Sequence, residues 1–184
     1  MGKLILILGG ARSGKSSFAV AQAKKLSSGQ SGVAGVAYVA TASAVDEEMK
    51  RRIERHRKRR PASWKTIEER VDISKILAKL EKVSIVIIDC LTILISNFLL
   101  SGEKEAAILK KIKELSRTLK RRNLTTLIVS NEVGMGIVPE NRLGRSFRDI
   151  AGQSNQIVAE LADEVYLLEA GIPVKIKDQR SPSS

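Results

Sequence analysis

The sequence predicts an α/β protein with a mostly parallel central sheet flanked by helices. Short and almost wholly apolar runs alternate with amphipathic stretches along the 184 residues, a pattern typical of parallel strands buried on both faces. The first apolar run, residues 4–8, enters a glycine-rich turn that a helical pattern follows. Two strands over 164–169 and 173–177, joined by Ala170-Gly171, are expected to close the sheet as a hairpin.

The composition favours a single domain, expected over residues 1–177, with a frayed polar tail over 178–184. Hydrophobic residues make up 43% and charged residues 28% of the chain, which is typical of a globular protein. The longest apolar run, residues 91–100, has about half of the ~20 residues that a membrane span needs. The start of the chain lacks a secretion signal, and the single cysteine, Cys90, cannot form an internal disulfide. We therefore expect a cytoplasmic protein with no membrane span.

The turn after the first strand carries the strongest functional pattern. Residues 9–16, Gly-Gly-Ala-Arg-Ser-Gly-Lys-Ser, match G-x-x-x-x-G-K-[ST] at every fixed position. Glycines let backbone N–H groups curl around an anion, and the following helix adds the positive end of its dipole. Lys15 is expected to reach the terminal phosphates, and the Ser16 hydroxyl is expected to bind magnesium. The strand before the loop and the helix after it favour phosphate binding over a chance glycine turn.

The other elements follow from hydrophobic period and from turn residues. Extended segments are expected over residues 36–41, 64–68, 84–89 and 124–130. Amphipathic patterns and helix-ending signals predict helices over residues 15–26, 45–59, 72–80, 90–100, 103–122 and 145–162.

The only histidine, His56, lies in the helix predicted over residues 45–59. It shares the body-facing side of that helix with three apolar residues at helical spacing, Val45, Met49 and Ile53. Residues 50–60 carry eight basic side chains and one acid, so positive charge surrounds the imidazole. Such charge favours the neutral imidazole and holds phosphates, as a nucleophile would require. The alternative is a half-buried histidine at a helix end, and these residues alone leave both interpretations open.

Two more candidates stand where predicted strands end. Asp89 ends the 84–89 strand, the position at which P-loop proteins place the acid that organises the magnesium shell. Thr41 ends the 36–41 strand, and ligands of parallel sheets lie beyond the carboxyl ends of the strands. The alternatives are an ordinary acid and a plain strand end.

A glycine-rich loop, residues 131–139, leaves the same edge of the sheet after the 124–130 strand. Its Glu132 is a candidate base for a substrate hydroxyl, and the alternative is a loop acid paired with Arg142 or Arg145. The following helix carries four polar residues that we expect to line a pocket, Arg148, Asp149, Asn155 and Gln156. Among all these residues, the candidates for the substrate side are Glu132, Arg148 and Asn155.

The formal net charge of +12 raises the question of a nucleic-acid partner. Much of that charge lies in residues 50–60, and aromatic residues make up only 3% of the chain, so few rings can stack on bases. A concentrated basic segment also suits a nucleoside triphosphate. We therefore expect no nucleic-acid partner.

Taken together, the motifs resemble those of one enzyme family. They are residues 9–16, Tyr38-Val39-Ala40-Thr41-Ala42, the segment from Arg52 through His56, Arg60 and Trp64 to Glu68, Asp89-Cys90-Leu91-Thr92, residues 131–139, and the segment from Arg145 to Gln156. In this combination, over nearly the whole chain, the sequence resembles the bifunctional adenosylcobinamide kinase / adenosylcobinamide-phosphate guanylyltransferase family of cobalamin biosynthesis.

The resemblance implies two reactions on a RecA-like fold assembled as a homotrimer. ATP or GTP, with Mg²⁺, phosphorylates adenosylcobinamide. GTP then guanylylates His56, and GMP passes to adenosylcobinamide phosphate. Lys15 also belongs to the catalytic residues, and Ser16 and Asp89 to the metal ligands. The resemblance places the nucleotide contacts at Gly9, Gly10, Ala11, Arg12, Ser13, Gly14, Lys15, Ser16, Ala40, Thr41, Ala42, Arg57, Lys58, Arg59, Arg60, Glu68 and Asp89.

The chain departs from the family pattern at three places, one of which is the basic segment, residues 50–60, which is denser than the motif requires. Some relatives carry glutamate where Asp89 stands, and many carry a tryptophan near Ile93-Leu94, which affects packing on the substrate side. Two alternative functions remain at this stage. One is a P-loop small-molecule kinase without the guanylyltransferase step, and the other is a RecA-like nucleic-acid-binding ATPase.

Overall fold

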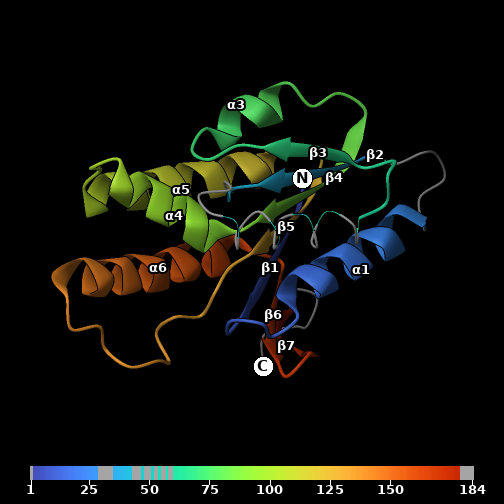
Figure 1. The fold of residues 1–184 in the computed structure, drawn as a ribbon. Helices are drawn as coiled ribbons and strands as arrows, with labels where there is room; N and C mark the ends of the chain where they lie inside the picture. The colour runs from blue at the N-terminus through green and yellow to red at the C-terminus, as the bar shows by residue number, and fades with distance from the viewer. Residues whose placement is uncertain are drawn as a thin grey trace.

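The computed structural model describes residues 2–28, 35–42, 47, 51, 54, 57 and 60–178. These residues form a seven-stranded sheet with the order β3-β2-β4-β5-β1-β6-β7 (Figure 1). The strands are β1 (Lys3–Gly9), β2 (Gly35–Ala40), β3 (Lys65–Glu68), β4 (Val83–Asp89), β5 (Thr125–Val129), β6 (Glu164–Glu169) and β7 (Ile172–Asp178). Neighbouring strands are parallel except for the antiparallel hairpin β6–β7. The predicted mostly parallel sheet with a closing hairpin is confirmed.

Helices cover both faces of this sheet. They are α1 (Lys15–Ser28), α3 (Ile73–Ala78), α4 (Leu91–Leu100), α5 (Glu105–Arg121) and α6 (Arg142–Leu161). The alternation of side chains along β1 explains the two layers, because successive residues of a strand point to opposite faces. Leu4 and Leu6 pack in the core beneath α3, α4, α5 and α6, whereas Ile5 and Ile7 pack beneath α1 (Figure 1).

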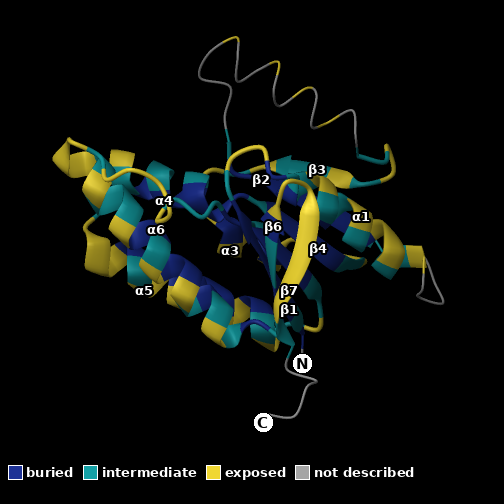
Figure 2. Cartoon of the chain, turned by 90° about the horizontal axis from the view of Figure 1, so that it is seen from below, coloured by how far each residue is buried: buried dark blue, intermediate teal, exposed yellow. Residues whose placement is uncertain are grey.

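Burial follows this layering. The five inner strands of the sheet, β2, β4, β5, β1 and β6, and the inner faces of the helices are largely buried. The edge strand β7 is exposed (Figure 2). In the part of the chain that the structure describes, no helix combines the length and the apolar character that crossing a membrane requires.

Most predicted elements agree with the structure to within one or two residues at each end, but α6 begins at Arg142, three residues before the predicted start. The Asn141 side chain accepts a hydrogen bond of 2.7 Å from the Gly144 N–H and so caps the additional turn. The helix predicted over 45–59 is described only at Glu47, Arg51, Glu54 and Arg57, which are all helical. His56 lies outside the described residues.

The parallel register aligns the carboxyl ends of four neighbouring strands at one edge. Ile7 of β1 is opposite Val129 of β5, Val129 is opposite Asp89 of β4, and Asp89 is opposite Ala40 of β2. The loops after these strands therefore start side by side. In an open α/β sheet this is the edge at which ligands bind, and it is the edge that carries the predicted site residues.

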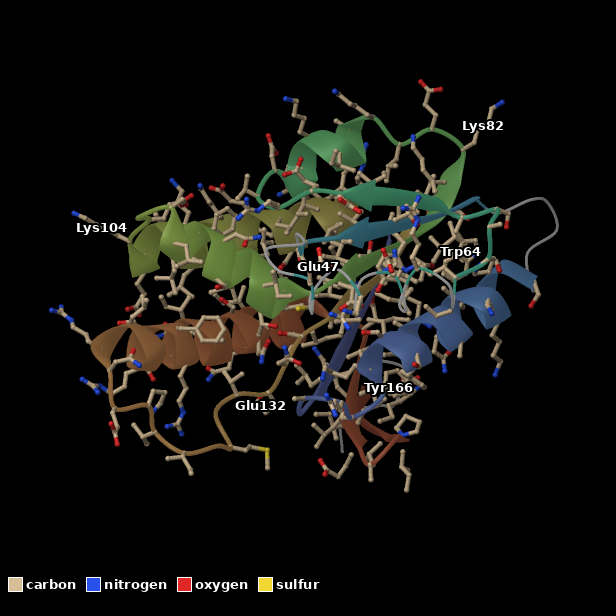
Figure 3. The ribbon with its side chains drawn as sticks, in the orientation of Figure 1. Glu47, Trp64, Lys82, Lys104, Glu132 and Tyr166 are labelled. Atoms are coloured by element: carbon tan, nitrogen blue, oxygen red, sulfur yellow. The ribbon has the colours of Figure 1, made fainter. Side chains whose placement is uncertain are left out.

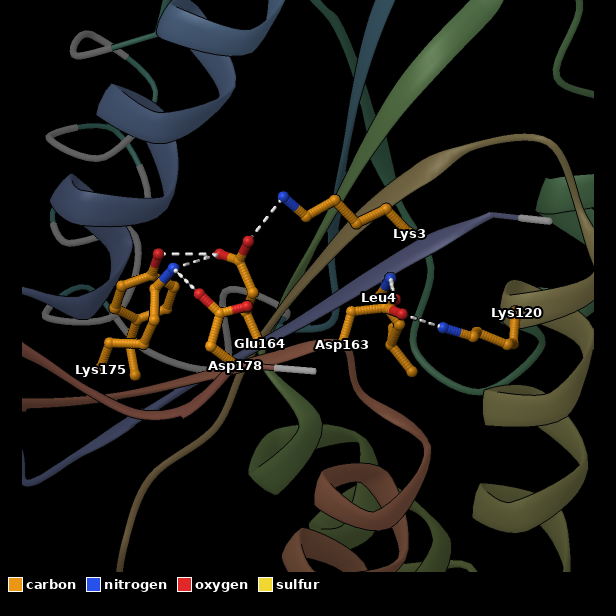
Figure 4. A network of polar contacts seen from close by, with 8 residues as sticks. Lys3, Leu4, Lys120, Asp163, Glu164, Lys175 and Asp178 are labelled. Atoms are coloured by element: carbon orange, nitrogen blue, oxygen red, sulfur yellow. Dashed lines mark hydrogen bonds and ion pairs between the residues drawn. The ribbon is translucent and has the colours of Figure 1, made fainter. Parts of the chain in front are cut away.

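A polar network lies at the opposite edge, where β1 and β6 begin (Figure 4). The buried carboxylate of Glu164 lies 2.7 Å from Lys3 Nζ and accepts a 2.8 Å hydrogen bond from the Tyr166 hydroxyl. Burial opposes ionisation of Glu164, but these two hydrogen bonds and the charges of Lys3 and Lys175 outweigh it and lower the pKa of its carboxyl group. This network ties three strands together far from the carboxyl-end loops.

Candidate functional site

The phosphate loop connects β1 to α1 and has a backbone that only glycine tolerates at its first position. Gly9 has a φ of 149°, and a Cβ atom placed there would lie 2.4 Å from the Leu168 carbonyl oxygen. Gly14 also has a positive φ, of 94°, immediately before the first turn of α1. The Ser13 carbonyl accepts a 3.1 Å hydrogen bond from the Gly171 N–H, so the β6–β7 turn supports the loop. The N-terminus of α1 therefore presents its backbone N–H groups at the turn formed by the phosphate loop.

Lys15 is folded over this loop. Its side chain is buried, and its Nζ donates to the carbonyl of Gly10 and lies 3.4 Å from the hydroxyl of Ser13. Ser16, the next residue, is half-buried in the first turn of α1. An ammonium group held against the phosphate loop in this way is placed to neutralise phosphate charge.

Asp89 ends β4 and is held by a tyrosine from the neighbouring strand. The Tyr38 hydroxyl donates a hydrogen bond to Asp89 Oδ2. Tyr38 is only 1% exposed. Burial, followed by the charge of Asp89, raises the pKa of Tyr38, so the hydroxyl remains a proton donor. The guanidinium carbon of Arg60 lies 3.4 Å from the centre of the Tyr38 ring, which is cation–π geometry.

A cavity of about 220 Å³ lies between α1 and this tyrosine–arginine pair. Ser16 lines it from α1, and Tyr38 and Arg60 line it from the other side. The Nε atom of Arg60 is buried and has no hydrogen-bond partner among the described residues. Since buried donors in folded proteins are nearly always satisfied, this unpaired N–H is suited to an acceptor atom of a ligand.

Thr41, predicted as the last residue of the strand, directly follows β2, but it does not face an open site. It is fully buried, and its hydroxyl accepts from the Cys90 N–H and donates to the Cys90 carbonyl, both at 2.8 Å. The Thr41 carbonyl accepts a 3.0 Å hydrogen bond from the Asn97 amide. The peptide between Asp89 and Cys90 is cis. Thr41 therefore holds the backbone next to Asp89 in place and offers no free group to a nucleotide.

The loop after β5 is built on buried amides. The Ser130 hydroxyl donates to Asn155 Oδ1 at 2.6 Å, and the Asn155 amide donates to the Asn131 carbonyl at 3.2 Å. The Asn131 amide in turn donates to the Thr92 hydroxyl at 2.9 Å. Asn155 is buried beneath this loop, so it supports the loop and does not line an open pocket as expected.

Glu132 lies where the chain enters this loop (Figure 3). Its Oε1 accepts from the Gly134 N–H at 2.9 Å, and the alternative of a pair with Arg142 or Arg145 is wrong. Arg145 instead donates to the carbonyls of Pro139 and Glu140.

The remaining polar residues of α6 differ in their surroundings. Arg148 donates to the Gly134 carbonyl at 2.6 Å and so holds the loop from the side of α6. Asp149 and Gln156 are exposed on α6, and their place in a pocket stays a prediction.

The structure thus brings together residues 9–16, Asp89 and Arg60, and it adds Tyr38, to which sequence reasoning gave no role. Tyr38 is two residues before the end of β2 and lies on the same face of the sheet as Asp89. Its contact with Asp89 becomes evident only when β2 and β4 are known to pair. Glu68 ends β3 opposite Ala40 and is exposed, as is Arg57. Ala42 is half-buried after β2. His56, Lys58 and Arg59 lie outside the described residues.

Comparison with known proteins shows similarity over nearly the whole chain. The family model described as cobinamide kinase / cobinamide phosphate guanyltransferase matches residues 5–176. The bifunctional adenosylcobalamin biosynthesis protein CobU of Escherichia coli is 41% identical, over 95% of this chain and 99% of the relative. CobU of Salmonella typhimurium is 43% identical over the same shares. The bifunctional adenosylcobalamin biosynthesis protein CobP of Pseudomonas aeruginosa is 41% identical over 95% of this chain and 97% of its own length.

The solved structure of a KaiC-like protein from Pyrococcus horikoshii shares the fold. It superposes with a TM-score of 0.56 at 16% identity, over 99% of this chain and 82% of that chain. At this identity the likeness concerns the fold alone, and it confirms the predicted RecA-like arrangement.

Proposed function

Because the chain belongs to the cobinamide kinase / cobinamide phosphate guanyltransferase family, we propose that it catalyses both reactions in cobalamin biosynthesis. It phosphorylates the hydroxyl of adenosylcobinamide with ATP or GTP, and it then transfers GMP from GTP to adenosylcobinamide phosphate. The family match over residues 5–176 carries this proposal. The intact phosphate loop beside Asp89 and Arg60 supports it.

The loop residues would hold the triphosphate in both reactions. The backbone N–H groups of residues 9–16 and the Lys15 ammonium would bind the terminal phosphates. The Nε–H of Arg60, which has no partner among the described residues, would donate to a further phosphate oxygen. The family resemblance assigns nucleotide contacts also to Ala40, Ala42, Glu68 and the basic residues from Arg57 to Arg60.

The donor set at the edge of the sheet fits magnesium. Ser16 offers a hydroxyl and Asp89 a carboxylate, which are the oxygen ligands that a hard cation prefers, and magnesium commonly uses one or two such groups together with phosphates. When bound, the ion would neutralise charge on the phosphate oxygens.

In the first reaction, an oxygen of the acceptor attacks the γ-phosphorus, and the bond from that phosphorus to the β-phosphate oxygen breaks. Glu132 is the proposed base for the hydroxyl proton, because its loop starts beside the phosphate loop. In the second reaction, a nitrogen of His56 attacks the α-phosphorus of GTP and pyrophosphate leaves. The acceptor phosphate then displaces the histidine, so that one difficult transfer becomes two displacements. Lys15 and the loop amides would stabilise the departing pyrophosphate.

We also propose that the enzyme acts in the cytoplasm as a homotrimer. The resemblance supplies the oligomeric state. The edge strand β7 exposes three apolar side chains, Ile172, Val174 and Ile176, and such a surface supports an interface with another protein chain.

Incubation with GTP labelled at the α-phosphate, followed by denaturing electrophoresis, tests the proposed function. The protein is expected to retain the label, and addition of cobinamide phosphate is expected to discharge it into a cobinamide–GDP product. A chain that phosphorylates cobinamide but never retains the label would be a kinase alone.

A further inference from the structure

One side chain joins two parts of the candidate site that lie on separate segments. The Tyr38 hydroxyl contacts the Asp89 carboxylate, and the Tyr38 ring supports the Arg60 guanidinium. We propose that Tyr38 is a positioning residue that sets the orientation of Asp89 and Arg60 together for a magnesium-bound nucleotide. This inference rests on the proposed function, since it concerns the same nucleotide site.

The hydroxyl acts on the carboxylate. Tyr38 is part of the buried core beneath α1, so its ring has no freedom to turn away from Asp89. With Oδ2 occupied by the tyrosine O–H, the carboxylate has one preferred rotation and its second oxygen remains for a cation. Groups that hydrogen-bond a metal ligand in this way orient the ligand and tune its affinity.

The ring acts on the arginine. The Arg60 guanidinium stacks on the face of Tyr38, while its buried Nε has no hydrogen-bond partner in the described part of the chain. Arg60 and Ser16 line the same cavity, so the stacking holds this donor toward the phosphate-loop helix. Arg60 is the last residue of the basic segment, residues 50–60, and Tyr38 therefore links the end of that segment to the acid on β4.

The chain contains a matched control at the opposite edge of the sheet. Tyr166 donates to Glu164 at 2.8 Å, and Lys175 Nζ lies 5.3 Å from the Tyr166 ring centre (Figure 4). This is the same combination of tyrosine, carboxylate and cation, but it lies away from the phosphate loop. Removing the Tyr166 hydroxyl measures what such a contact does for the fold alone.

The experiment compares Tyr38→Phe and Tyr166→Phe with the wild type. Equilibrium affinity for GTP is measured by fluorescence with excess Mg²⁺ and again with a chelator. Tyr38→Phe keeps the ring and loses only the hydroxyl. It is expected to weaken binding about 10- to 100-fold with Mg²⁺, the usual loss for a partner of a metal ligand, and to leave binding with the chelator unchanged. Tyr166→Phe is expected to bind as the wild type in both conditions.

Tyr38→Leu tests the second half of the proposal. It removes the ring as well as the hydroxyl, so the support of Arg60 is lost and GTP affinity is expected to fall with the chelator too. If Tyr38→Leu and Tyr38→Phe bind alike in both conditions, the coupling to Arg60 is wrong.

Two other results would overturn the role of Tyr38. One is a Tyr38→Phe variant that binds GTP with the wild-type dependence on Mg²⁺. The other is an equal loss with and without Mg²⁺, which would show that the hydroxyl serves the fold only. Failure of the proposed function has a different signature, because the wild type itself would then retain no label from GTP.

Discussion

The backbone N–H of Glu132 donates to the carbonyl oxygen of Gly9 at 2.9 Å. β1 and β5 are parallel neighbours, so this bond extends their ladder beyond the last paired residues and joins the two loops that follow. The Glu132 carboxylate turns back to accept from the Gly134 N–H. An acid is thereby held on the loop that starts beside the phosphate loop.

We predict that Glu132→Gln slows phosphorylation of cobinamide and spares guanylylation of the enzyme. The amide oxygen of glutamine can still accept from Gly134, and the backbone bond to Gly9 is unchanged, so the loop should keep its shape. Loss of a general base typically costs 10²–10⁴-fold, and about 100-fold or more is expected in kcat for the kinase reaction. Steady-state kinetics measures this rate. The control is Glu140→Gln, which changes an exposed acid directly after that loop. A kinase rate equal to that of the wild type would show that Glu132 is not the base.

The first glycine of the phosphate loop offers a test of its backbone geometry. We expect Gly9→Ala to lower the free energy of unfolding by about 1–3 kcal/mol, because the new methyl group meets the Leu168 carbonyl at 2.4 Å and the residue has a positive φ. Gly10→Ala is the control, since a Cβ atom there meets nothing within 4 Å. Urea unfolding of both variants gives the comparison. Equal stability of the two would mean that the loop relaxes at no cost.

Most of the fold could be predicted from local patterns. Three apolar runs have the length and composition of buried parallel strands, and they form β1, β4 and β5 in the structure. Each predicted end agrees with the structure to within one residue. The start of α6 was missed because Gly144 is typical of a loop. The structure shows that Asn141 caps the helix through the N–H of that glycine.

The site could be predicted only where it is contiguous in sequence or ends a strand. Residues 9–16 form a local motif, and Asp89 ends an apolar run, so both were found. The contact between Tyr38 and Asp89 joins residues 51 positions apart and depends on β2 lying next to β4. Thr41 was expected at an open edge, but the Cys90 backbone and the Asn97 amide bury it. The spacing of apolar residues along the chain does not show which distant strands will pair.

Lys15→Ala is predicted to impair both reactions, because both place a triphosphate on the same loop. Removing one preorganised electrostatic contact in an active site typically costs 10²–10³-fold, and about 100-fold is expected for each rate. The two rates are measured separately, by phosphorylation of cobinamide and by retention of label from GTP. The control is Lys25→Ala, an exposed lysine in the last turn of α1. If one of the two rates stayed normal, the reactions would not share the loop.

Glu164 gives a prediction about stability and pH. Its pKa is lowered in the folded protein, so its contribution to stability is present above the ordinary value of 4.5 and is lost as the pH falls through the lowered value. Glu164→Gln is therefore expected to lower the free energy of unfolding at pH 7 by about 1–2 kcal/mol, and the difference from the wild type should shrink below pH 4.5. Urea unfolding across this range measures it, with the exposed Glu169→Gln as the control. A constant difference at all pH values would contradict the assignment.

His56→Ala separates the two proposed reactions most sharply. The imidazole is the proposed carrier of GMP, whereas phosphoryl transfer to the acceptor hydroxyl needs only the phosphate loop, the metal ligands and a base. The variant should therefore retain no label from GTP labelled at the α-phosphate and should phosphorylate cobinamide at the wild-type rate. The chemical stability of the label provides a second measurement, since a phosphorus–nitrogen bond is lost in acid and kept in alkali, unlike an ester to serine. Label that persists in the variant, or label that survives acid in the wild type, would assign the guanylylated residue elsewhere.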